Sequence, residues 1–124
     1  MKNQPKITVG IMDGQTEVFG RLDENFRRDG FGPVSGKFSA RATQGMIVLF
    51  DETHREISRS PSIRLTADHD SSFTLFNVTI GTRFHWERKE DQTFQGDLIL
   101  QLRKDGTICA INEIPLEDYL KSVI

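Results

Sequence analysis

Cysteine is almost absent from this sequence, and long apolar runs are absent altogether. Cys109 is the single cysteine among 124 residues, which excludes an internal disulfide and any zinc site built on several thiolates. No stretch approaches the roughly 20 apolar residues that a membrane-spanning helix needs, and no signal-peptide pattern opens the sequence. Because Cys109 lies in the apolar run 107–111, we expect it to be a small buried hydrophobic residue.

The sequence also lacks an excess of either charge. Lys and Arg number 16 and Asp and Glu number 18, so the net charge is −2. Nucleic acids are bound by net basic surfaces, which makes a nucleic-acid partner unexpected and disfavours an oligonucleotide-binding barrel. Leu and Ala, the residues of helical domains, number only 13, whereas Val, Ile, Phe, Tyr, Trp and Thr together number 38. This composition favours strands.

Alternating apolar residues predict a mainly β domain of about nine short, mostly antiparallel strands. We expect a β roll, sandwich or small barrel with one C-terminal helix. The segments that read as strands are 6–12, 18–22, 34–43, 46–50, 56–59, 62–66, 73–80, 83–88, 93–103 and 107–112. Residues 6–22 are interpreted as a hairpin around Asp13–Gly14, residues 23–33 as a polar loop, and residues 89–92 as a charged turn.

Three short segments give sharper local signals. Asp105–Gly106 lies between two apolar alternations and predicts a hairpin turn, and Gln44–Gly45 predicts another turn. Within 73–80 the apolar positions change phase, which predicts a β-bulge or a bend. After residue 112 the period becomes helical. Pro115 is expected as the first helical residue, with Glu117 in the first turn.

The only tryptophan lies in a segment that mixes aromatic and charged residues. His85, Trp86 and Glu87 are candidate binding residues, with Trp86 as a stacking platform for a sugar ring or a base. The alternative is an ordinary strand in which Trp86 faces the core and His85 and Glu87 face outward. Strand alternation favours that alternative.

Metal and acid–base chemistry have weak candidates in this sequence. The three histidines, His54, His69 and His85, lack the close spacing of metal ligands, and 68–70 resembles a metal-binding triplet in composition only. We therefore expect neither a metal nor another cofactor. The remaining possibility is a carboxylate pair for glycoside hydrolysis, with solvated side chains as the alternative. Its candidates are Asp51, Glu52, Glu56, Glu87, Glu90 and Asp91.

The C-terminal stretch 93–124 resembles the SpoIID/LytB family, the stage II sporulation protein D and amidase enhancer proteins of bacterial cell walls. The family shows an aromatic-x-Gly-x-Leu strand and a hairpin, followed by an Ile-Asn-x-Val-Pro-Leu-Glu-x-Tyr-Leu run that opens a helix. The matching residues are Phe94, Gly96, Leu98, Ile111, Asn112, Pro115, Leu116, Glu117, Tyr119 and Leu120.

The resemblance implies cleavage of peptidoglycan glycan strands in the manner of a lytic transglycosylase, or enhancement of a wall amidase. In the family, the catalytic glutamate belongs to a Ser-Glu-Met motif shortly after the Tyr-Leu helix opening. This sequence ends before that point, so no residue in it inherits a catalytic role. Residues 1–112 are expected to form a non-catalytic β domain, and residues 113–124 the start of the helix that opens a truncated SpoIID-like domain.

The same resemblance bears on partners and location. Glycan strands of peptidoglycan or a wall amidase are the expected partners, the cell envelope is the expected location, and the fragment is expected to be monomeric. The apolar helix face formed by Leu116, Leu120 and Ile124 is expected to pack on the missing domain. The alternative function is that of a non-catalytic glycan- or protein-binding β module, for which His85 to Glu87 would supply the contacts.

Overall fold

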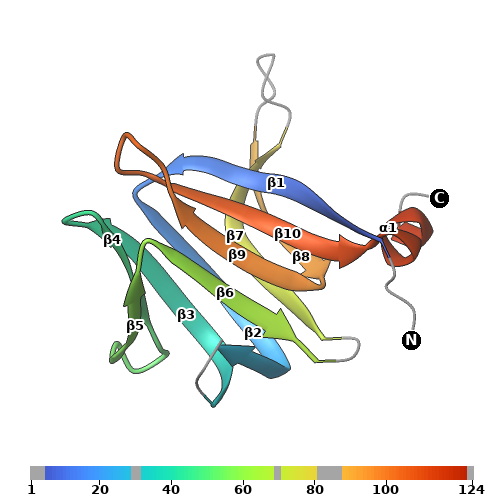
Figure 1. Cartoon of the computed structure of the whole chain (residues 1–124), viewed down its shortest axis with the longest axis horizontal. Helices are drawn as coiled ribbons and strands as arrows, with labels where there is room; N and C mark the ends of the chain where they lie inside the picture. Colours follow the sequence, from blue (N-terminus) through green and yellow to red (C-terminus); the bar gives the residue numbers. More distant parts are fainter. Residues whose placement is uncertain (1–4, 29–31, 69–70, 81–87, 123–124) are drawn as a thin grey trace.

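Nearly the whole chain forms one curled antiparallel sheet (Figure 1). The computed structural model describes residues 5–28, 32–68, 71–80 and 88–122. Its elements are β1 (Lys6–Gln15), β2 (Glu17–Arg28), β3 (Pro33–Thr43), β4 (Met46–Phe50), β5 (Glu56–Ser60), β6 (Ser62–Ala67), β7 (Ser72–Ile80), β8 (Arg88–Gln95), β9 (Asp97–Leu102), β10 (Ile108–Pro115) and α1 (Leu116–Ser122). The predicted mainly β, antiparallel fold with a short C-terminal helix is confirmed.

The strands follow the order β1-β10-β9-β6-β2-β3-β4-β5, and β7 joins this path by pairing with β2 and β8. Strand β2 is long enough to have two different neighbours along one edge. Its residues 20–22 pair with β7 and its residues 26–28 pair with β6. The sheet can therefore curl around a single core as a half-barrel (Figure 1).

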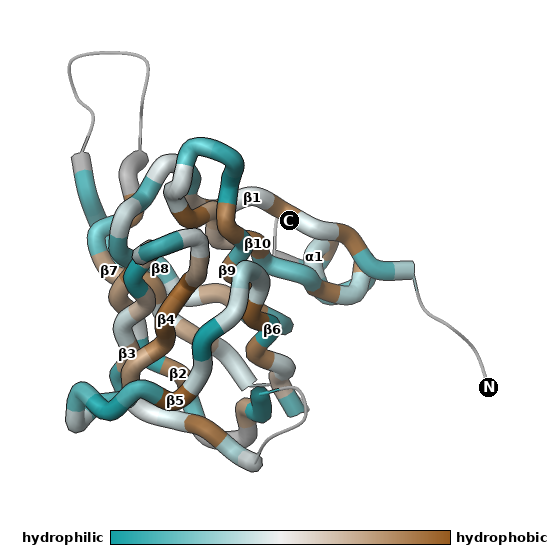
Figure 2. Tube along the Cα trace, turned by 60° about the vertical axis from the view of Figure 1, so that its left-hand side comes forward, coloured by the Kyte–Doolittle hydropathy of each residue, from teal (hydrophilic) through white to brown (hydrophobic). Residues whose placement is uncertain are grey.

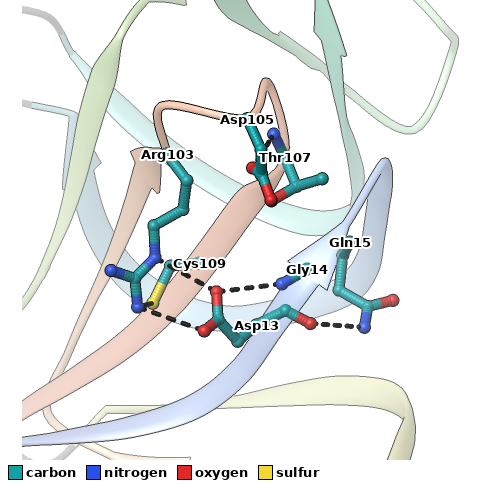
Figure 3. Close-up of polar contacts among 7 residues, drawn as sticks. All are labelled: Asp13, Gly14, Gln15, Arg103, Asp105, Thr107 and Cys109. Atoms are coloured by element: carbon teal, nitrogen blue, oxygen red, sulfur yellow. Dashed lines mark hydrogen bonds and ion pairs between the residues drawn. The ribbon is translucent and has the colours of Figure 1, made fainter.

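The predicted hairpin over residues 6–22 is wrong, because β1 pairs with β10 and β2 pairs with β3. Asp13–Gly14 does not turn the chain. Gly14 has a φ of +67° and lies where the β1–β10 register shifts between Met12 and Gln15, so the pair forms a β-bulge. The Asp13 carboxylate binds Arg103 Nε at 3.1 Å (Figure 3), which ties this bulge to the β9–β10 hairpin.

The loop expected at residues 23–33 is wrong for 23–28 and for Pro33, which belong to strands, while residues 29–31 lie outside the described residues. The turn expected at 89–92 is also wrong. Strand β2 continues to Arg28, with a register shift between Leu22 and Phe26. Phe26 is fully buried, so its burial outweighs the polar composition of its neighbours. Residues 89–92 belong to β8 and pair with β7. The expected strand 83–88 lies outside the described residues except for Arg88, where β8 begins.

The expected strand 93–103 is divided by a bend at Gly96, which has a φ of +100°. Other local signals are confirmed. Gln44 and Gly45 have φ values of +50° and +75° in the β3–β4 turn, and Asp105–Gly106 joins β9 to β10. The phase change within β7 is a bulge at Asn77, which has a φ of +59° and lies within the β7–β8 register shift.

The inner face of the half-barrel carries the hydrophobic core, and the hydropathy colouring shows apolar segments recurring along the strands (Figure 2). The ring of Phe73 contacts Phe26 edge-on, with centroids 6.2 Å apart, and stacks on Phe94 at 5.4 Å. Cys109 is buried, as expected. The buried hydrophobic residues are Val18, Leu22, Phe26, Phe38, Ala40, Ile47, Val48, Leu49, Ile63, Leu65, Phe73, Leu75, Val78, Leu98, Leu100, Ile108, Cys109, Ala110 and Ile114.

The helix begins one residue later than predicted. Pro115 is the last residue of β10, opposite Lys6 of β1, and α1 begins at Leu116. Residues 113–115 thus continue the β-domain strand rather than opening the helix. The Leu116 amide donates to the Pro5 carbonyl at 2.9 Å, which secures the strand–helix junction. Leu120 is 47% exposed on α1. Among the described helices, none has the length and apolar character to span a membrane.

Candidate functional site

Three charged side chains from neighbouring strands meet at the end of the sheet nearest α1. Arg64 of β6 places Nη1 at 3.0 Å from Asp97 Oδ2 of β9 and at 2.8 Å from Glu113 Oε1 of β10. Asp97 and Glu113 are directly opposite in the β9–β10 register. Like charges in that position repel each other, so Arg64 offsets a repulsion that the strand pairing creates.

The Arg64 hydrogen bond lowers the pKa of Glu113 below its usual value, and burial opposes this shift only in part. The positive charges of Arg64 and Lys6 act in the same direction. In return, the bond to Glu113 raises the pKa of Arg64. A general acid needs a raised pKa, so Glu113 is suited to hold a charge and not to donate a proton.

This electrostatic arrangement predicts an acid-dependent loss of stability. Because the pKa of Glu113 is lower in the folded protein than its usual 4.5, its contribution is fully present above that pH. It is lost as the pH falls through the folded value. We expect the melting temperature to fall less steeply below about pH 4.5 in Glu113→Gln than in the unmodified protein. Calorimetry of both proteins at a series of pH values around and below 4.5 tests this prediction. Melting temperatures that fall in parallel with pH would contradict it.

A second set of contacts fixes the bend between β8 and β9. Asn112, which is only 6% exposed, donates through Nδ2 to the carbonyls of Gln95 and Asp97 at 2.9 and 3.1 Å. These carbonyls flank Gly96. The second carboxylate oxygen of Asp97 accepts from the Ala67 amide at 2.9 Å. The bend is therefore held from β10 and from the end of β6.

A polar cavity of about 150 Å³ opens beside these contacts; we call it the motif cavity. Its volume is below the roughly 300 Å³ of typical small-molecule sites, so it fits waters or one ligand substituent. The residues that line it are Lys6, Ala67, Ser71, Gln95, Gly96, Asp97, Glu113, Pro115 and Asp118. Asp118 comes from the first turn of α1, so the cavity lies where the helix meets the sheet.

The family-motif residues divide into three groups, apart from Ile111, which is half-buried in β10 and pairs with Ile99 of β9. Gly96 and Pro115 line the motif cavity, and Asn112 holds the bend beside it. Phe94 is partly buried against the core, and Leu98 is fully buried within it. Leu116, Glu117, Tyr119 and Leu120 all belong to α1.

The proposed binding residues His85, Trp86 and Glu87 lie outside the described residues, as do His69 and Asp70. Their expected roles therefore stay predictions. Among the residues that the structure places, no group of three histidine, cysteine or carboxylate side chains is arranged to hold a metal ion.

Several carboxylates considered for glycoside hydrolysis have structural partners instead. Asp51 Oδ1 accepts from the amides of Arg55 and Thr53 at 3.0 and 2.9 Å, and these bonds, with that from the Thr53 hydroxyl, lower its pKa. Glu56 binds Arg59, which lowers its pKa. Asp91 accepts from the Asn77 amide at 3.1 Å. Neither Asp51 nor Glu56 has the raised pKa of a general acid.

The sequence alone did not identify Arg64, Asp97, Lys6 or Asp118 as neighbours. Arg64 stands on the polar side of an alternating strand, which is typical of any exposed arginine. Its partners become visible only when β6 is known to pair with β9.

Comparisons with family models, with curated proteins and with solved structures gave no match to this chain.

Proposed function

We propose that this chain is the N-terminal β portion of a cell-wall protein of the SpoIID/LytB type, acting in the cell envelope. Its parent would cleave peptidoglycan glycan strands as a lytic transglycosylase, or would enhance a wall amidase. The observation that carries the proposal is the convergence of three motif residues. Gly96, Asn112 and Pro115 are separated in sequence, yet they gather where β9, β10 and α1 meet.

This convergence gives the motif a physical purpose. Asn112 locks the bend at Gly96, and Pro115 ends β10 so that α1 starts in a fixed direction. In the resembling family, the catalytic glutamate follows such a helix opening. The β portion would therefore serve to position the first turn of that helix, while Glu113, held as an anion by Arg64, serves structure and not proton transfer.

The test compares two chains on glycan strands from which the peptides have been removed. One is the present chain, and the other extends through the segment that follows α1. We expect soluble glycan fragments from the extended chain only, and their loss when the glutamate of its Ser-Glu-Met segment becomes glutamine. A further assay measures the rate of a wall amidase with each chain added.

The proposal fails if the extension holds no Ser-Glu-Met-like segment. It also fails if the extended chain neither releases fragments nor accelerates the amidase. Acceleration without release would assign the enhancer role and exclude the transglycosylase role.

A further inference from the structure

A groove with exposed aromatic residues lies where β2, β3 and β7 run side by side, and its volume is about 350 Å³. That volume is within the range of small-molecule sites. Phe19 of β2 and Phe76 of β7 line it, together with Phe38 of β3, which is buried in the core. Phe19 is 44% exposed, and among the large hydrophobic residues of the described strands it alone is exposed. We call this feature the aromatic groove.

A close approach at Gly20 holds β2, β3 and β7 together beneath the aromatic groove. A Cβ at this position would contact the Thr74 carbonyl oxygen and would lie 2.9 Å from the Phe38 ring. The Phe38 ring is only 4% exposed and packs in the core on the face of β2 opposite Phe19, so Phe19 and Phe76 are the aromatic side chains that a ligand in the groove would meet. Gly20 also pairs with Leu75, which places Phe76 beside Phe19 at the same level of the sheet.

Hydrogen-bonding side chains form the rim. His54 and Asn77 both have left-handed backbone conformations, with φ values of +66° and +59°, and both line the groove. The His54 amide donates to the Asp51 carbonyl at 2.9 Å, and the Asn77 amide donates to Asp91. Backbone strain of this kind persists only where surrounding contacts hold it, so the rim is preformed.

The charge of the rim selects among ligands. Asp51 and Glu52 face one cation, Lys37, so the lining is acidic. Nucleotides also stack on aromatic rings, but their phosphates would be repelled here. A pyranose ring offers an apolar C–H face for Phe19 and hydroxyl groups for the carboxylate, amide and imidazole groups of the rim.

We propose that the aromatic groove binds a short glycan of uncharged or amine-bearing pyranose units through stacking on Phe19. This inference does not rest on the cell-wall assignment, because it follows from the groove's own side chains. Glycan binding here would stand even if the extended chain showed no action on peptidoglycan.

The experiment is an amide chemical-shift titration of the chain with N-acetylchitotetraose. We expect saturable shifts at Phe19, His54 and Asn77 below about 10 mM ligand. Phe19→Ala is expected to weaken binding by about tenfold, whereas Phe19→Trp should retain or strengthen it. Ile99→Ala is the matched control, because Ile99 is also a partly exposed apolar residue in a strand but lies on β9; it should bind like the unmodified chain.

A tetragalacturonate titration tests the charge argument, and we expect no saturable shifts with this anionic glycan. The proposal is overturned if the chitotetraose shifts are absent or map elsewhere. It is also overturned if a folded Phe19→Ala variant binds with unchanged affinity, or if tetragalacturonate binds as well as chitotetraose. Far-UV circular dichroism of each variant establishes folding before titration.

Discussion

Replacing Gly96 with alanine is expected to lower the free energy of unfolding by about 3 kcal/mol. The alanine Cβ would lie 2.5 Å from the Glu113 carbonyl oxygen and 3.2 Å from Ile114 Cβ. Neither atom can retreat easily, because β10 is paired on both sides. The residue would also hold a φ of +100°, which side chains disfavour. Urea denaturation measures the loss.

Gly106→Ala is the matched control for this prediction. Gly106 also has a positive φ, of +84°, but a Cβ there would meet nothing within 4 Å. We expect a loss of about 1 kcal/mol, from the backbone conformation alone. The difference between the two variants isolates the close approach of β10 to the bend. Equal losses would show that the contact with Glu113 has no energetic importance.

Replacing Arg64 with methionine is expected to lower the free energy of unfolding by about 2 kcal/mol. The methionine keeps much of the apolar stem but leaves Asp97 and Glu113 opposite each other without a cation. Unpairing a fully buried charge costs about 3 to 5 kcal/mol. These side chains are 15 to 34% exposed, so solvent screening reduces that figure. Urea denaturation at low ionic strength gives the value.

Neutralising the two acids should restore most of the stability lost by Arg64→Met. The triple variant Arg64→Met, Asp97→Asn, Glu113→Gln removes the repulsion, and the asparagine still offers an acceptor to the Ala67 amide. The deficit of the single variant should also shrink in about 0.5 M salt, where exposed charges are screened. A deficit that neither salt nor the acid substitutions reduce would mean that Arg64 acts through packing alone.

The strands could be predicted from sequence because alternation is a local property. Residues such as Ile7 and Val9, or the run 46–50, show their strand character without reference to anything distant. Pairing is not local, and Asp13–Gly14 illustrates the limit. The same dipeptide serves a tight turn or a bulge, and the choice depends on β10, which lies at the other end of the sequence.

The candidate site, too, could be predicted from the sequence only in part. Gly96, Asn112 and Pro115 could be named from sequence because a family pattern contains them, and Asn112 is buried and donates to two backbone carbonyls. Arg64 and Lys6 reach the site through strand pairings that no spacing reveals. The aromatic groove was missed for a related reason. Its lining residues come from β2, β3, β7 and the β4–β5 turn, and no sequence spacing shows that these segments lie together.

The pairing of β1 with β10 has a consequence for how this protein folds. Lys6 finds its partner at Pro115, so β1, which is synthesised before the other described strands, has no paired strand until β10 has been made. Contacts of such long sequence separation carry a large loop-closure entropy and slow the search for the native topology. Until β10 has been made, the backbone N–H and C=O groups of β1 have no partner strand. The sheet is complete only when β1 and β10 pair.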